Sequence, residues 1–124
     1  MVILNMDHTA LRVKDVKKAY HFYHEILSLP TIRTIGPNDD PRIAFLQGIE
    51  LSQIRPEHNG VSFSHLGLAV SKIEEVYEDL KDKGVVFEGP VREVKFEEEK
   101  KAVKIAFFND PDGNRVELVE WRDL

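Results

Sequence analysis

An internal repeat constrains this chain more than any other feature of its 124-residue sequence. The segment DHTALRVKDVKKAYHFY, residues 7–23, aligns with SHLGLAVSKIEEVYEDL, residues 64–80, so that His8 falls on His65. Two later runs also align: RIAF with KIAF, and IEL with VEL. Two copies of one supersecondary unit explain these matches. We place the copies at residues 5–57 and 62–122, inside a single domain that spans residues 1–124.

Each copy has the pattern of a strand, a helix and further strands. In the first copy Leu11 and Val13 alternate with His8, Ala10 and Arg12, which is typical of a half-buried strand. The spacing then predicts a helix that begins after Asp15 as its N-cap. Its expected apolar stripe consists of Val16, Ala19, Tyr20, Tyr23 and Leu27.

The second copy has clearer helix limits. Ser71 and Glu74 fit an S-x-x-E capping box, and Gly84 fits the position that follows the end of a helix. The run DPDG at 110–113 predicts a type I turn between two antiparallel strands, KIAFF and RVELVEW.

Four polar residues at equivalent repeat positions point to one face. His8 and His65 alternate with large apolar residues that must face the helices, and Glu50 and Glu117 are each flanked by apolar residues. A lone strand histidine is more often a core or surface residue, but four such side chains together are different. Two carboxylates about 4 Å apart repel by about 4 kcal/mol at an effective dielectric of 20, so they need a proton, an arginine or a metal. With two imidazoles beside them, a divalent cation is the simplest solution.

Composition narrows the function further. The chain has no Cys, so any metal must take nitrogen and oxygen ligands, and this donor set does not select one metal. The net charge is −5, with 17 basic residues interleaved among 22 acidic ones, which argues against nucleic-acid binding. No apolar run approaches the ~18 residues that a membrane span requires. We therefore expect a cytoplasmic protein that does not bind membranes.

The motifs HTALRVKDVKKAYHFYHEILSL and DPDGNRVELVE resemble those of the vicinal oxygen chelate superfamily, and of glyoxalase I (lactoylglutathione lyase) in particular. The resemblance covers nearly the whole chain. It implies an α+β fold in which two βαβββ modules form a cupped eight-stranded mixed sheet with helices on the outer face. It also implies His8, Glu50, His65 and Glu117 as metal ligands, and a homodimer.

The same resemblance implies a metal-dependent isomerase or lyase that acts on a small substrate, such as the hemithioacetal of methylglyoxal with glutathione or another thiol. One divalent ion per site (Ni, Zn or Co, with Fe or Mn as further options) would stabilise an ene-diolate. Glu117 would be the base that moves the proton, with Glu50 as its counterpart. Arg12 matches an arginine that pairs with a glutathione carboxylate; a salt bridge within the strand is the alternative.

One position departs from the glyoxalase I pattern, because Ile54 replaces an asparagine that holds glutathione. Roles for Arg55, Arg92 and Lys95 stay open. Related alternatives are an epimerase, whose second ligand is glutamine rather than Glu50, a dioxygenase, a thiol transferase, and a metal-free binding protein of the bleomycin-resistance type. The remaining histidines, His21, His24 and His58, are expected at the surface.

Overall fold

The computed structural model describes residues 1–26, 28–60, 62–109 and 113–124. Contacts within the chain divide it into two compact units. The unit His8–Ser64 is here called the first half, and the unit that combines Met1–Asp7 with His65–Leu124 is called the second half. Strand β1 (Val2–Val13) contributes to both units, since its first residues belong to the second half.

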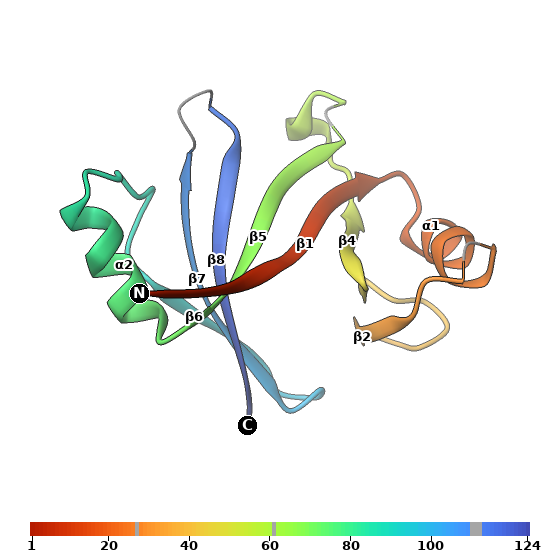
Figure 1. Cartoon of the computed structure of the whole chain (residues 1–124). Helices are drawn as coiled ribbons and strands as arrows, with labels where there is room; N and C mark the ends of the chain where they lie inside the picture. Colours follow the sequence, from red (N-terminus) through yellow and green to blue (C-terminus); the bar gives the residue numbers. More distant parts are fainter. Residues whose placement is uncertain (27, 61, 110–112) are drawn as a thin grey trace. The chain divides into compact units, whose positions relative to one another are not determined.

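In its described residues, the first half combines the α-helix α1 and two short helices of other types with a set of strands (Figure 1). Strand β2 pairs antiparallel with β3, β3 pairs antiparallel with β4, and β4 pairs parallel with β1. Helix α1 packs against β3 and β4. After β1, the elements are α1 (Val16–Tyr20), the π-helix η1 (His21–Ile26), β2 (Thr31–Ile35), β3 (Ile43–Leu46), β4 (Gly48–Gln53) and the 3-10 helix η2 (Pro56–His58).

The second half repeats this plan with longer strands. Strand β5 pairs parallel with β8, β8 pairs antiparallel with β7, and β7 pairs antiparallel with β6. Helix α2 packs against β7 and β8. The elements are β5 (Phe63–Ser71), α2 (Ile73–Asp82), β6 (Arg92–Phe96), β7 (Lys101–Asn109) and β8 (Arg115–Asp123).

The predicted fold class is therefore confirmed: the described residues form two βαβββ modules with eight strands in mixed parallel and antiparallel pairing. The predicted antiparallel pairing of KIAFF with RVELVEW is β7 with β8. Residues 110–112 of the predicted turn lie outside the described residues. The limits of the two copies and the single domain over 1–124 stay predictions. Among the described residues, no helix has the length and apolarity that a bilayer crossing needs.

Each module buries its own apolar cluster between helix and strands. In the first half, Val16 of α1 meets Leu46 and Leu51, and Leu11 and Val13 of β1 pack against them. Side chains alternate along a strand. Because Leu11 and Val13 face the helix, the even-numbered residues of β1, His8 among them, face the opposite way.

The second half follows the same rule. Val70 of β5 meets Ile73 and Val76 of α2 together with Leu118 of β8, and Leu68 packs against this cluster. The strand face that carries His65 is thereby turned away from the helix, as the alternation in the sequence predicted.

The first helix differs from the prediction. Asp15 is the N-cap as expected, and its Oδ1 accepts from the Lys18 N–H at 3.1 Å. However, the α-helix ends at Tyr20 and continues as a π-helix. The wider turn places the rings of Tyr20 and His24 in a stack, 5.2 Å apart and 3° from parallel, and leaves His24 Nδ1 2.8 Å from the Leu29 carbonyl oxygen. Leu27 of the predicted stripe lies outside the described residues.

The predicted capping box of the second helix is wrong. Ser71 is the last residue of β5, and Lys72 is the N-cap, with a left-handed backbone (φ 55°) and no side-chain cap of its own. Glu120 of β8 takes the role instead, since its carboxylate accepts from the Lys72 N–H at 2.8 Å and the Ile73 N–H at 3.1 Å. A carboxylate brought in by a neighbouring strand suits the positive end of the helix better than the nearby hydroxyl.

The predicted end of α2 is confirmed. Gly84 has φ 93°, a conformation that a residue with a Cβ adopts only under strain. Its N–H donates to the Lys81 carbonyl and the Val85 N–H donates to the Leu80 carbonyl, both at 3.0 Å, which is a Schellman motif.

Candidate functional site

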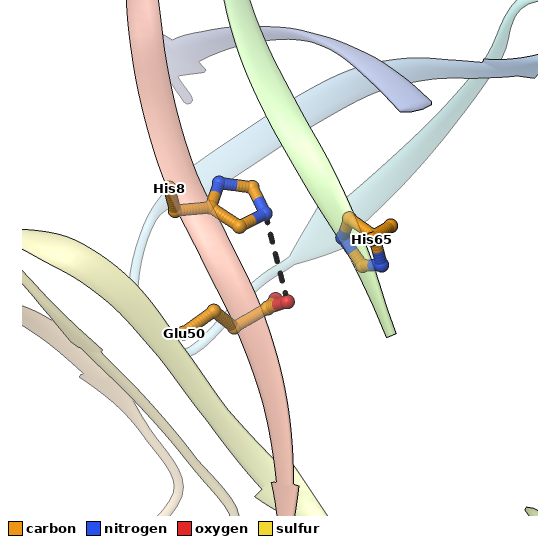
Figure 2. Close-up of side chains that lie close together, drawn as sticks. All are labelled: His8, Glu50 and His65. Atoms are coloured by element: carbon orange, nitrogen blue, oxygen red, sulfur yellow. Dashed lines mark ion pairs between the residues drawn. The ribbon is translucent and has the colours of Figure 1, made fainter. Parts of the chain in front are cut away.

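The first half holds His8 beside Glu50. In the parallel pairing of β1 with β4, Glu50 lies opposite Ala10, two residues beyond His8 on the same face. The small Ala10 side chain leaves room for the Glu50 carboxylate to reach back toward the imidazole. Nε2 of His8 lies 3.7 Å from Oε2 of Glu50, and both side chains are largely shielded from solvent. Figure 2 shows the two side chains pointing toward one another.

The second half holds His65 beside Glu117 in the same way. In the parallel pairing of β5 with β8, Glu117 lies opposite Gly67, again two residues beyond the histidine. Nε2 of His65 lies 3.1 Å from Oε1 of Glu117. The repeat in the sequence therefore becomes a repeat in strand register, and each half carries one nitrogen donor next to one oxygen donor.

These residues stand out for their burial. In the described part of the chain, three residues are both polar or charged and buried: His8, His65 and Glu117, with exposures of 4%, 8% and 8%. A buried carboxylate is costly unless a partner compensates its charge. Each imidazole supplies one such partner, and a cation bound between imidazole nitrogen and carboxylate oxygen would supply a stronger one.

An aromatic ring accompanies each pair, which the sequence reading did not anticipate. Phe45 lies opposite Glu50 in the pairing of β3 with β4, and its ring is 6.3 Å from that of His8 at 85°. In the second half, Phe107 lies opposite Glu117, and its ring is 5.3 Å from that of His65 at 87°. The aligned RIAF and KIAF runs end in these two phenylalanines, so the signal was present in the repeat.

An arginine covers each of these rings. The guanidinium carbon of Arg33 lies 5.6 Å from the Phe45 ring centroid, and that of Arg115 lies 3.8 Å from the Phe107 centroid. Arg115 also makes a bidentate ion pair with Glu88, with N–O distances of 2.9 Å and 2.8 Å. The hydrogen bonds from Arg115 hold the pKa of the Glu88 carboxyl below its usual value.

The predicted substrate arginine has a partner within its own half. Arg12 lies on β1 beyond Ala10, and its Nη2 donates to Ser64 Oγ at 3.2 Å. Its backbone N–H also donates to the Ser62 carbonyl oxygen at 2.7 Å. The side chain is thus anchored by a neutral hydroxyl in this structure, which leaves its charge uncompensated by that contact.

The other singled-out residues have local or surface positions. His58 Nδ1 accepts from the Arg55 N–H at 3.1 Å in η2, and His21 is exposed on η1. Arg92 and Lys95 are exposed on β6. The half-buried Ile54 donates its N–H to the Val13 carbonyl oxygen at 2.9 Å, so this position is occupied by strand pairing and an apolar side chain.

Comparisons with known proteins match this arrangement. The family model of the Glyoxalase/Bleomycin resistance protein/Dioxygenase superfamily matches residues 5–118. A probable lactoylglutathione lyase of Synechocystis is 32% identical over 91% of this chain and 92% of its own length. The lactoylglutathione lyase of Escherichia coli O157:H7 is 31% identical over 94% of this chain and 92% of its own length.

Solved structures agree with the fold. A methylmalonyl-CoA epimerase of Streptomyces coelicolor superposes with a TM-score of 0.73 at 19% identity, over 96% of this chain and 98% of that chain. The methylmalonyl-CoA epimerase of Mycobacterium tuberculosis gives a TM-score of 0.72 at 23% identity, over 95% of this chain and 88% of that chain. By its repeat, its strand order and its match over residues 5–118, the chain belongs to the Glyoxalase/Bleomycin resistance protein/Dioxygenase superfamily.

Proposed function

We propose that the chain is a metal-dependent enzyme of the glyoxalase I type, which isomerises the hemithioacetal of methylglyoxal with glutathione or another thiol. The observation that carries the proposal is the pair of equivalent histidine and glutamate contacts, one in each half, at the same strand register. Relatives named lactoylglutathione lyase, at 31–32% identity over nearly the whole chain, support it.

In this proposal His8, Glu50, His65 and Glu117 together hold one divalent cation. Two imidazole nitrogens and two carboxylate oxygens fit Ni, Zn or Co, and Fe or Mn are further options. The burial of three of the four side chains supports a compensating positive charge. When bound, the cation supplies positive charge that polarises two neighbouring substrate oxygens and orients them.

The proton transfer is assigned to Glu117. Its carboxylate takes the proton from the hydroxyl-bearing carbon of the hemithioacetal, and the electrons of that C–H bond form the carbon–carbon double bond of an ene-diolate. Glu117 then returns the proton to the adjacent carbon, and the hydroxyl proton passes to the former carbonyl oxygen, which leaves a hydroxy thioester. The reaction is therefore an isomerisation that needs no oxidant or reductant. Glu50, in the first half, balances the positive charge of the cation without moving the proton. Arg12 binds an anionic group of the substrate.

We also propose that the chain forms a homodimer. Met1 and the first residues of β1 carry exposed apolar side chains, which is unusual for a surface that faces only water. They belong to Met1, Val2, Ile3, Leu4 and Met6, each at least 41% exposed. Light scattering of the purified protein in solution tests this assembly.

The experiment that tests the proposed function combines elemental analysis of the purified protein with a turnover assay on methylglyoxal plus glutathione. Stoichiometric metal with turnover is the expected result. Metal without turnover would indicate a different substrate, either the hemithioacetal of another thiol or an acyl-CoA. Methylmalonyl-CoA epimerisation is the assay for an acyl-CoA substrate. Failure to bind any divalent metal after loading would contradict the proposal and favour a ligand-binding protein without metal.

A further inference from the structure

A row of three side chains lies beside His65 in the second half: Phe107, then Arg115, then Glu88. The Phe107 ring is perpendicular to the imidazole, with 5.3 Å between their centroids. The Arg115 guanidinium carbon lies 3.8 Å from the Phe107 centroid, within the range of a close cation–π contact. Glu88 accepts two hydrogen bonds from Arg115, one from Nε and one from Nη2.

The backbone connects both ends of this row to the His65 and Glu117 pair. The Glu88 N–H donates to the Phe107 carbonyl oxygen at 2.8 Å. Glu88, which binds Arg115, is therefore also bonded to the backbone of Phe107, whose ring Arg115 covers. Arg115 itself lies two positions before Glu117 on β8 and thus on the same strand face. In the pairing of β7 with β8, Phe107 lies directly opposite Glu117.

The row closes one side of a hollow. Glu88, Phe107 and Arg115 line a cavity of about 240 Å³, which also reaches Arg92. The Phe107 ring would have free space to tilt into this cavity if Arg115 did not lie over it. The planar guanidinium is itself held at two nitrogens by Glu88, so it loses little further freedom when it covers the ring.

We propose that Arg115 is a positioning residue that, held by Glu88, fixes the Phe107 ring against His65 and so sets the orientation of the imidazole next to Glu117. A side chain behind a metal-ligating histidine determines which way the ring nitrogen points, and loss of such a group typically weakens metal binding. The part of this inference that concerns metal rests on the proposed function; the part that concerns the imidazole orientation does not.

The test compares Arg115→Met with a matched control on the same strand. Arg122 makes an equivalent bidentate pair with Glu93, with N–O distances of 2.9 Å and 3.0 Å, at the far end of β8. Arg122→Met therefore removes the same charge and the same kind of ion pair at a distance from His65. Arg115→Lys keeps the charge but loses the bidentate geometry, and Glu88→Gln removes the charge of the anchor.

The first readout is the NMR spectrum of the His65 ring protons in the metal-free protein. The Phe107 ring current shifts these protons, so Arg115→Met and Glu88→Gln should displace and broaden their signals, whereas Arg122→Met should leave them in place. The second readout is the affinity for Co²⁺ by competition titration, together with its absorption spectrum. We expect Arg115→Met to weaken Co²⁺ binding about tenfold, and Arg115→Lys less.

Equal His65 signals in Arg115→Met and Arg122→Met would overturn the inference, whether or not the wild-type protein binds metal. Unchanged Co²⁺ affinity in Arg115→Met would overturn its metal-binding part. If the wild-type protein binds no metal, the proposed function fails, and the NMR comparison alone decides the role of Arg115. Circular dichroism checks that each variant is folded; should Arg115→Met unfold, Glu88→Gln and Arg115→Lys give the same comparison.

Discussion

The two halves carry the same pair of residues in the same register, yet they hold them differently. In the first half the imidazole and carboxylate of His8 and Glu50 are 3.7 Å apart, and the ring of Phe45 lies 6.3 Å from the imidazole. In the second half the corresponding distances for His65 are 3.1 Å and 5.3 Å.

The difference extends to the arginine behind each ring. Arg33 lies 5.6 Å from the Phe45 centroid, while Arg115 lies 3.8 Å from the Phe107 centroid and is held at two nitrogens by Glu88. A duplicated backbone thus places equivalent residues equivalently, but the tightness of each pair depends on side chains outside the repeated motif. The second pair is the more preorganised of the two, which suits the residue to which we assign proton transfer.

The largest expected effect is the loss of metal binding without loss of the fold. His65→Ala removes one nitrogen donor from a strand face that does not pack against α2, so we expect the loss of stoichiometric metal and of activity while the domain stays folded. Elemental analysis and circular dichroism measure the two outcomes. His8→Ala is the matched variant in the other half. Retention of stoichiometric metal by either variant would break the equivalence that we draw between the halves.

The next effect distinguishes the two glutamates. Glu117→Gln keeps the size of the side chain but removes the proposed base, so kcat should fall by about 10³-fold, within the usual range for a general base. Glu50→Gln should cost less, by about tenfold, since this residue balances charge without moving the proton. Steady-state kinetics on metal-loaded proteins measure both. Equal losses would mean that proton transfer is shared between the halves, against our assignment.

The caps of the two helices give a smaller contrast, in stability. Asp15 caps α1 from the adjacent position in the chain, whereas Glu120 caps α2 from β8. We expect Asp15→Ala to lower the free energy of unfolding by about 1 kcal/mol. Glu120→Ala should lower it by about 2 kcal/mol, because two charge-assisted hydrogen bonds are lost.

Denaturant titration measures both changes in the free energy of unfolding. Ser71→Ala serves as the control for the capping-box prediction and should have little effect. If Ser71→Ala lowered the free energy of unfolding as much as Glu120→Ala does, Ser71 rather than Glu120 would be the cap of α2.

The smallest expected effect is a change in stability with pH. The pKa of Glu74 on α2 is lowered chiefly by its hydrogen bond from Lys104, at 2.6 Å. A carboxyl with a lowered folded-state pKa contributes stability above its unfolded pKa and loses it as the pH falls through the folded value. At neutral pH Glu74→Gln should therefore cost about 0.3 kcal/mol, as expected for an exposed pair screened by solvent.

This difference should vanish once the pH is well below 4.5, the reference pKa of the carboxyl. Thermal melts of wild type and Glu74→Gln at neutral and acidic pH measure it. A gap between the two melting curves that persists or grows in acid would contradict the sign of the linkage.

Much of the fold was predictable because it depends on short-range patterns. The alternation in β1 and β5, the apolar stripes of the helices, the Asp15 cap and the Gly84 termination each need only a few neighbouring residues to be read. The repeat then supplied the long-range information that a single strand lacks, since it showed that His8 and His65 occupy equivalent places.

The errors lie where a distant residue competes with a local one. Ser71 had the right spacing for a cap, but Glu120 reaches the same N–H groups from another strand with a full negative charge. The π-helix after Tyr20 depends on how Tyr20, His24 and Leu29 fit together. The spacing of apolar residues along the helix does not predict this fit.

By itself, the sequence determined the class of elements, the two modules and, in each half, the histidine and glutamate that share a strand face. These follow from periodicity, which the backbone geometry of helices and strands imposes on any chain. Only the tertiary structure decided the register that sets Glu50 opposite Ala10 and Glu117 opposite Gly67, and the stacking of Arg115 on Phe107. Such contacts depend on the pairing and packing of segments far apart in the chain, for which local sequence carries no periodic signal.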